Sequence, residues 1–374
     1  MDLGKKFTEI FGGGDILTNR NFFQKSSEVS VREQPPARNE SELLSFHEYS
    51  KIRTFHAPGR VNIIGEHTDY NGGFVLPCAI NMGTYALIRP RGDDETRFAS
   101  TNDVPPGWEI YPRGIVHHMR ERKNFGGFDM LFSGDIPSGA GLSSSASIEM
   151  ATAVAINETF ALGFEMLELV KLAQESENNF CGVNCGIMDM FAIGMGKKGF
   201  ATYLHCDSMK FEYVPLTLSE FQMVIMDTKK RRSLNESRYN ERRAECEAAH
   251  PARMRHVSTE NERVKAAISA MNAGDVPALG RLLVESHNSL RDDFEVSCFE
   301  LDTLVDLAIK NPACVGARMM GAGFGGCAIA IVKREKVQNF ADAVCAEYEK
   351  IVGHACAMYP AESGDGAREV YARL

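Results

Sequence analysis

Residues 134–151 read GDIPSGAGLSSSASIEMA, and the organisation of the chain can be worked out from this stretch. A strand-like pattern ends at Gly134, a loop rich in glycine and serine follows, and a helix is predicted to begin at about Ser144. The N-terminus of a helix carries unpaired backbone N–H groups and a partial positive charge. The stretch therefore predicts a strand, an anion-binding loop and a helix in succession.

The composition of this loop favours phosphate as the anion. Gly139 and Gly141 would let the backbone approach phosphate oxygens closely, and the serines at 143–145 would add hydroxyls for phosphate or magnesium. A serine-capped helix after a flexible loop is the alternative. We favour phosphate because the glycine and proline breaks and the three consecutive serines exceed what a cap requires.

A second glycine-rich stretch, GARMMGAGFGGCAIAIV, begins at Gly316 and has glycines in GxGxxG spacing. These glycines precede the strand predicted at 327–332, whereas in a dinucleotide-binding fold they follow a strand and open a helix. The Gly-x4-Gly-Lys-Ser/Thr string of a Walker loop does not occur in the sequence. Two interpretations stay open for this second stretch. It is either a loop that packs against the phosphate site from another domain or a tight turn entering a strand.

A third stretch, APGRVNIIGEHTDYNGG from Ala57, places Arg60, Glu66, His67 and Asp69 within one short segment. Carboxylates, an imidazole and a guanidinium suit a polyhydroxylated ligand, because sugar hydroxyls both donate and accept hydrogen bonds. Alternatively, Asp69 could make an Asx turn and Glu66 could pair with Arg60. Taken together, the residues favour a sugar site.

The hydrophobic pattern predicts an α+β protein with two domains, residues 1–215 and 216–374. Asn-Gly at 71–72, flanked by apolar runs, predicts a hairpin. Residues 12–50 are predicted to be an exposed loop with a short helix near 40–47. The other predicted strands are 128–132, 222–227, 327–332 and 355–360, and the predicted helices are 5–11, 146–161, 165–178, 235–273, 277–290 and 337–351.

The composition excludes several classes of function. The chain has 374 residues, 44% hydrophobic and 24% charged, with a net charge of -9 and a pI of about 5.7, which argues against nucleic-acid binding. Ten cysteines occur without a CxxC pair, and no apolar stretch is long enough for a membrane or a secretion signal. We expect a monomeric cytoplasmic protein that binds small molecules.

The three motifs, in this order, resemble those of the GHMP small-molecule kinases, and GRVNIIGEHTDYNGG is similar to the galactokinase signature. The resemblance extends to CGIMD at 185–189, DTKKRRSLNESRYNERR from Asp227 and GDGARE at 364–369. It implies an N-terminal domain of ribosomal S5 domain 2-like type, a ferredoxin-like C-terminal domain and an active site between them. The activity implied is ATP-dependent phosphorylation of the anomeric hydroxyl of galactose, with Mg²⁺.

The resemblance also implies roles for individual residues. Asp189 matches the catalytic aspartate and Arg60 its partner, an arrangement that suits phosphoryl transfer because an arginine keeps a nearby carboxylate ionised. Ser145 and Glu177 match the Mg²⁺ ligands, although the pattern alone makes Glu177 a helix-surface residue. The implied sugar contacts are Glu66, His67, Asp69, Gly186 and Tyr239. The implied ATP-binding residues are Pro137, Gly139, Ala140, Gly141, Leu142, Ser143, Ser144, Ser145 and Ala146.

The sequence departs from the family at Met190, where glutamine is usual, and at Met320, where threonine is usual. Three alternatives to a galactose kinase remain at this stage. The acceptor could be galacturonate, N-acetylgalactosamine or another hexose, although a carboxylate on the sugar would face Glu66. The chain could also be a sugar sensor without turnover, or a nucleotide-binding interaction module.

Overall fold

The computed structural model describes residues 2–12, 52–137, 139–230 and 235–370. The elements of the first part are α1 (Leu3–Phe11), β1 (Arg53–Asn62), the 3-10 helix η1 (Asp69–Asn71), β2 (Phe74–Val75), β3 (Pro77–Pro90), β4 (Thr96–Ser100), α3 (Ile110–Arg122), β5 (Phe128–Gly134), α4 (Ser144–Thr159), α5 (Met166–Asn179), α6 (Met188–Gly194), β6 (Phe200–His205) and β7 (Lys210–Pro215). Those of the second part are β8 (Phe221–Asp227), α7 (Asn235–Glu247), α8 (Pro251–Ala273), α9 (Val276–Asp292), α10 (Phe299–Lys310), β9 (Cys314–Met319), β10 (Cys327–Lys333), η2 (Arg334–Lys336), α11 (Val337–Val352), β11 (Ala357–Ala361) and β12 (Arg368–Glu369).

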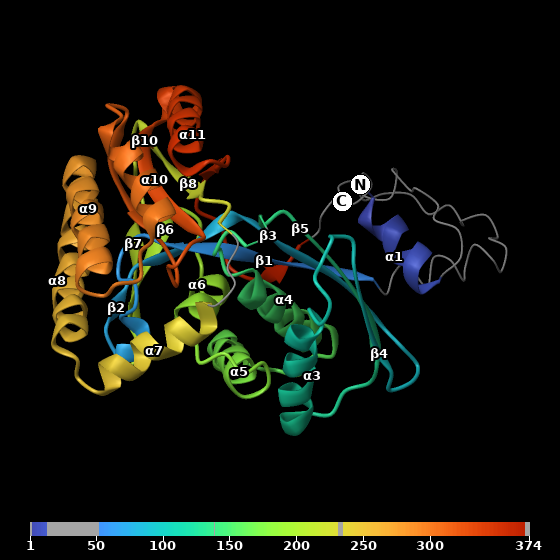
Figure 1. Ribbon diagram of the computed structural model, residues 1–374. Coiled ribbons are helices and arrows are strands. Elements are labelled where there is room, and N and C mark those ends of the chain that lie inside the picture. Colours follow the sequence, from blue (N-terminus) through green and yellow to red (C-terminus); the bar gives the residue numbers. More distant parts are fainter. Residues whose placement is uncertain (1, 13–51, 138, 231–234, 371–374) are drawn as a thin grey trace, which may run out of the picture.

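The first sheet has the strand order β12-β1-β3-β5-β4 and is mainly antiparallel. Helices α3, α4 and α5 lie together on one side of its long strands (Figure 1). Most side chains of α4 are buried, because this helix runs between the sheet and its neighbouring helices. The start of α5 is held by a capping box, in which Glu165 and Glu168 each accept from the other's backbone N–H. Helix α4 itself begins at Ser144, directly where the loop after β5 ends.

The second sheet has the order β11-β8-β10-β9, with every pair antiparallel. Along the chain the helices α7–α10 follow β8, then β9 and β10 form a pair, and α11 leads to β11. This order and succession are those of a ferredoxin-like fold. The fold is thus two-domain α+β, as the sequence predicts.

One apolar cluster joins the two sheets. It contains Val61 and Leu76 from the first domain together with Ile225, Leu279 and Ile329 from the second. The last strand, β12, returns to the first sheet, where Glu369 is paired with Phe55. A third, small sheet, β2-β6-β7, pairs a strand from the loop between β1 and β3 with the two strands after α6, and the predicted boundary at 215/216 falls directly after β7. That boundary stays a prediction.

The predicted helices and strands are present, with differences in extent. The predicted helix 235–273 is two helices, α7 and α8, and the pattern did not predict α3, α6, α10, β4, β6, β7, β9 or β12. The helix predicted near 40–47 lies outside the described residues. No helix in the described part of the chain is long and apolar enough to cross a bilayer.

The hairpin prediction at 71–72 is wrong in its geometry. The chain does reverse, since β1 and β3 are antiparallel partners with Asn62 opposite Pro77. However, residues 63–76 form a wide loop that contains η1, and Thr68 Oγ1 ties it together by donating to the carbonyls of Gly65 and Phe74. This loop, rather than a two-residue turn, carries the carboxylates of the third motif.

Candidate active site

The three motifs meet around one cavity of about 650 Å³. Its walls come from the loop between β5 and α4, called the phosphate loop below after its predicted role, and from the loop after β1, residues 183–189, α7 and the loop before β10. The described residues that line it are Arg60, Glu66, His67, Asp69, Tyr70, Tyr111, Pro137, Gly139, Gly141, Leu142, Ser143, Ser144, Ser145, Glu177, Val183, Cys185, Gly186, Met188, Asp189, Tyr239, Asn240, Gly321 and Ala322.

Arg60 and Asp189 form a two-pronged ion pair at the centre of this cavity. The Nε and Nη2 atoms of Arg60 donate to Oδ1 and Oδ2 of Asp189, each over 2.7 Å. Nη1 donates to the carbonyl of Gly141 over 2.7 Å, so the same guanidinium also contacts the phosphate loop. Burial opposes the charge of Arg60, but Asp189 raises the pKa of the guanidinium above its usual value. The guanidinium therefore keeps its positive charge where the phosphate loop meets α6.

The phosphate loop has the backbone that its glycines predict. Gly139 and Gly141 have φ angles of 74° and 71°, a region that other residues adopt only with strain. The hydroxyl of Ser143 donates to Oδ2 of Asp189, and α4 begins at the next residue. The side chains of Ala140 and Ala146, by contrast, belong to the apolar core and do not line the cavity.

Ser145 and Glu177 come together from α4 and α5. The Ser145 hydroxyl donates to Oε1 of Glu177 over 3.1 Å, and the Cys185 thiol lies 3.4 Å from Oε2. Glu177 is only 7% exposed, so its interpretation as a helix-surface residue is wrong. Burial, and then the nearby Asp189 carboxylate, raise the pKa of Glu177 to about 7.

One alternative paired Glu66 with Arg60, but in the structure the Glu66 carboxylate has other partners. Its Oε1 accepts from Arg318 Nη2 over 3.1 Å and from the Gly321 N–H over 2.7 Å. Its Oε2 accepts from Asn62 Nδ2 over 2.9 Å. Glu66 is only 1% exposed, but it still lines the cavity.

His67 has a packed, neutral ring. Its Nδ1 lies 2.7 Å from the Tyr70 hydroxyl, and the ring centroid lies 5.6 Å from that of Tyr239 and 4.8 Å from that of Phe294. Burial, and then the neighbouring His256, lower the pKa of His67 to about 3. The imidazole therefore acts as an uncharged wall of the cavity at neutral pH.

Asp69 lies against the backbone of Gly186. A Cβ atom at position 186 would be 1.7 Å from Oδ2 of Asp69, so only glycine leaves room for this carboxylate. Burial, and then the charge of Asp189, raise the pKa of Asp69 to about 6. Asp69 is thus one of four carboxylates among the described residues that line the cavity, and Asp189 lies close enough to affect its ionisation.

The second glycine-rich stretch packs against the phosphate loop, which was one of its two open interpretations. A Cβ atom on Gly321 would lie 3.5 Å from the carbonyl oxygen of Gly141, and Gly321 and Ala322 line the cavity. Met190 and Met320 are both fully buried in apolar clusters. The methionines therefore pack in the core and do not line the cavity.

Sequence reasoning missed some of the lining residues. Tyr70 and Asn240 are chain neighbours of the predicted Asp69 and Tyr239, so their adjacency was a usable signal. Nothing in the pattern pointed to Tyr111, because α3 was not predicted. Val183, Cys185 and Met188 belong to the segment around CGIMD and line the cavity beside Asp189.

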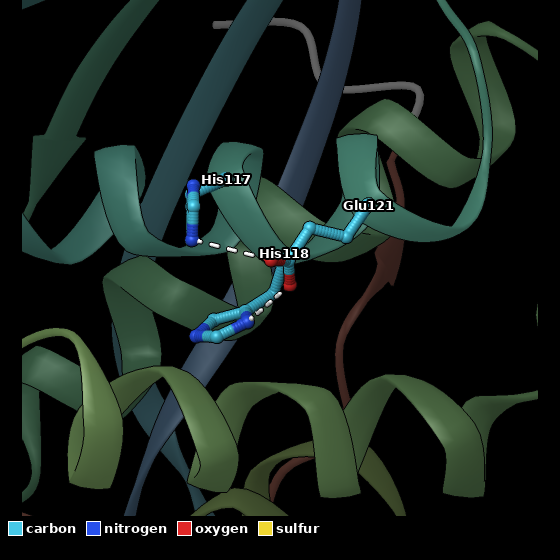
Figure 2. A group of neighbouring side chains, drawn as sticks. All are labelled: His117, His118 and Glu121. Atoms are coloured by element: carbon cyan, nitrogen blue, oxygen red, sulfur yellow. Dashed lines mark hydrogen bonds and ion pairs between the residues drawn. The ribbon is translucent and has the colours of Figure 1, made fainter.

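A separate group of possible metal ligands lies on α3, outside this cavity. Figure 2 shows His117, His118 and Glu121 with both imidazoles turned toward the Glu121 carboxylate. His117 Nε2 is 3.6 Å and His118 Nδ1 is 3.1 Å from its oxygens. These are ordinary contacts between residues three and four positions apart on a helix, so we assign no metal to the group.

Comparison with known proteins agrees with this geometry. Residues 111–197 match the model of the GHMP kinases N-terminal domain, residues 45–90 the galactokinase galactose-binding signature, and residues 267–350 the GHMP kinases C-terminal domain. Galactokinase from Exiguobacterium sibiricum is 45% identical over 86% of this chain and 95% of its own length. The galactokinase from Clostridium tetani is 42% identical over 88% and 96%.

The solved structures include a similar fold. A crystal structure of Lactococcus lactis galactokinase complexed with galactose superposes with a TM-score of 0.84 at 36% identity, covering 98% of this chain and 99% of that one. Mevalonate kinase from Methanococcus jannaschii, at 20% identity and a TM-score of 0.65, shares the fold alone. With the motifs assembled around one cavity and relatives matched along nearly their whole length, the chain belongs to the galactokinase family of GHMP kinases.

Proposed function

We propose that the protein transfers the γ-phosphoryl group of ATP to the anomeric hydroxyl of galactose. The observation that carries this proposal is the contact of one guanidinium, Arg60, with both the Asp189 carboxylate and the Gly141 carbonyl of the phosphate loop. A phosphoryl group held by that loop would lie next to the carboxylate that receives or orients the acceptor proton. Such proximity is the main requirement of phosphoryl transfer.

In this mechanism Asp189 orients or deprotonates the anomeric hydroxyl. The sugar oxygen forms a bond to the γ-phosphorus while the bond from phosphorus to the bridging oxygen of ADP breaks. Arg60 holds Asp189 in place through its ion pair and puts a permanent positive charge beside the transferred group. The phosphate loop supplies backbone N–H groups at the start of α4 for the remaining phosphates.

Two side chains, one from the first turn of α4 and one from the last turn of α5, fit a magnesium ion. Ser145 and Glu177 present two oxygen ligands 3.1 Å apart, in a pocket whose burial raises the pKa of the carboxyl, and hard cations prefer such ligands. We therefore propose Ser145 and Glu177 as its holders. When bound, Mg²⁺ would neutralise phosphate charge. ATP and Mg²⁺ are the only small cofactors that this mechanism requires.

The sugar would occupy the side of the cavity opposite the phosphate loop. Asp69 offers acceptors there, Gly186 leaves room for it, and Tyr239 and His67 form an aromatic wall. Glu66 also lines the cavity, and its charge is balanced by the ion pair with Arg318. Galactose hydroxyls would satisfy these polar groups, whereas the C4 epimer glucose would leave one of them unpaired.

The test is an ADP-release assay of the purified protein over galactose, glucose, N-acetylgalactosamine and galacturonate. Galactose should exceed glucose in kcat/KM by roughly 5- to 150-fold, the effect of about 1 to 3 kcal/mol from one unpaired buried group. Galacturonate should be poor, because its carboxylate would enter a cavity that already holds Asp69 and Asp189. A higher kcat/KM for galacturonate than for galactose would show that the protein is a kinase of a related sugar and not of galactose. ADP release that never depends on sugar would exclude a sugar kinase.

We also propose that the protein acts as a cytoplasmic monomer. The support is that none of its ten cysteines is joined in a disulfide and that the whole cavity forms within one chain. Light scattering coupled to gel filtration would test the oligomeric state, and a mass twice that of the chain would contradict the proposal. Fractionation of cells that express the protein would test the location.

A further inference from the structure

Arg318 is a fully buried charged side chain at the boundary between the two sheets. It lies on β9, is 0% exposed, and is among the largest fully buried side chains of the described residues. Its Nε donates to the carbonyl of Ile63 over 2.8 Å, and Nη2 donates to that of Asn62 over 2.6 Å. These two carbonyls belong to the end of β1 and the loop after it. A side chain of the second domain therefore binds the backbone that leads into the third motif.

The same guanidinium orients Glu66, and Glu66 in turn holds the loop before β10. Nη2 of Arg318 lies 3.1 Å from Oε1 of Glu66, and this oxygen accepts the N–H of Gly321 over 2.7 Å. Gly321 has a φ angle of 76°, a conformation that glycine adopts without strain, and the hydrogen bond from its N–H to Glu66 holds its backbone in one orientation. Its position faces the Gly141 carbonyl of the phosphate loop.

Stability alone does not explain this arrangement. Two charges in a fully buried site lose their hydration, and apolar residues of the same volume often give equal or greater stability. An ion pair does supply direction, because a planar guanidinium with several fixed bonds holds a carboxylate in one place. The main effect of the ion pair is therefore to fix the position of Gly321 through Glu66.

We infer that Arg318 is a positioning residue that acts through Glu66 to hold the Gly321–Ala322 backbone against the phosphate loop. This inference rests on the proposed function and extends it to a side chain outside the cavity wall. When the pair is lost, the loop from the second domain shifts relative to Gly141 and Arg60. A misplacement of about 1 Å at such a site costs turnover by roughly 10²-fold.

The experiment separates positioning from stability with four variants. Arg318→Lys keeps the positive charge, but an ammonium group cannot make the several fixed hydrogen bonds of the guanidinium. Arg318→Met leaves Glu66 buried without its cationic partner. The double variant Glu66→Gln/Arg318→Met removes both charges. Arg89→Met is the control, because it removes one of the three arginines that pair with the buried Asp129 in the first sheet, where neither Arg89 nor Asp129 lines the cavity.

Tm, kcat, the KM for ATP and for galactose, and hydrogen exchange of the peptide containing Gly321 would be measured for each. We expect Arg318→Lys to lower kcat by roughly 10- to 100-fold with a smaller change in either KM. The double variant should recover Tm relative to Arg318→Met, but it should keep the low kcat and show faster exchange at Gly321. Arg89→Met should lower Tm without changing kcat or that exchange.

Recovery of kcat together with Tm in the double variant would overturn the inference, since the pair would then be purely structural. Unchanged exchange at Gly321 in Arg318→Met and in the double variant would overturn it as well. The exchange measurement needs no turnover. A wild-type protein that failed to phosphorylate galactose would refute the proposed function, and the link from Arg318 to Gly321 would still be decided by exchange.

Discussion

Gly186 and Asp69 fit together only because one of them lacks a side chain: a Cβ at position 186 would lie 1.7 Å from Oδ2 of Asp69. This contact joins the segment before α6 to the wide loop after β1. It places the Asp69 carboxylate in the cavity that also holds Asp189. The position of the predicted sugar-binding carboxylate thus depends on a glycine more than one hundred residues away in the chain.

Replacing this glycine should displace Asp69. Gly186→Ala should raise the KM for galactose about 10-fold or more, because the new methyl group occupies the place of the carboxylate and one good hydrogen bond to a charged group is lost. Steady-state kinetics over galactose concentration would measure it. Gly92→Ala is the matched control, since a Cβ there meets nothing within 4 Å, and it should leave kinetics unchanged. Unaltered galactose kinetics in Gly186→Ala would contradict a role for Asp69.

Removing the charge of Asp189 should affect turnover rather than nucleotide affinity. Asp189→Asn should lower kcat by roughly 10²- to 10⁴-fold, the range for losing a general base, while leaving ATP binding nearly intact. Single-turnover kinetics and calorimetric ATP titration would measure the two effects. Turnover near that of the wild type would remove Asp189 from the catalytic role.

The two proposed metal ligands should affect the magnesium requirement. Ser145→Ala and Glu177→Gln should each raise the Mg²⁺ concentration needed for half-maximal activity, since each removes an oxygen ligand of the ion. The same titration on Ser100→Ala, a strand residue that does not line the cavity, serves as control. Equal magnesium curves for all variants would show that the metal is held elsewhere.

Asp69 should make galactose binding depend on pH. Its pKa of about 6 in the folded protein lies above the usual 3.8, chiefly because of burial. The protonated form therefore adds stability that is fully present below pH 3.8 and is lost as pH rises through about 6. Binding has the opposite sign, because the ionised carboxylate is the better acceptor for sugar hydroxyls.

The KM for galactose should consequently fall as pH rises from 5 to 7. Asp69→Asn should flatten this change, and it should raise the Tm of the ligand-free protein more at pH 8 than at pH 4. Kinetic pH profiles and thermal unfolding at matched pH values would measure both. Identical profiles for the variant and the wild type would show that another group titrates.

The local pattern was sufficient for the elements of the predicted phosphate site. The strand ending at Gly134, the glycine-rich loop and the helix from Ser144 are present as predicted, because glycine, serine and an apolar helical pattern act within a few residues of one another. The GxGxxG stretch lies between β9, which was not predicted, and β10, so its glycines do follow a strand, but they lead into another strand and not into the helix that a dinucleotide site requires.

The roles of individual charges were beyond the sequence pattern. Glu177 was interpreted as a surface residue because its helix is amphipathic with many polar neighbours, yet the packing of α4 against α5 buries it beside Ser145. Glu66 could equally have paired with Arg60. The choice of Arg318 instead depends on how the two sheets meet.

By itself, then, the sequence determined the class of fold, the phosphate loop and, through its resemblance to a family, the residues of the site. Only the tertiary structure decided which partner each buried charge has: Asp189 with Arg60, Glu66 with Arg318, and Asp69 against Gly186. The physical reason is range. Propensity and capping act over one or two turns of chain, whereas an ion pair or a close approach depends on distances between segments that only the packed core brings together.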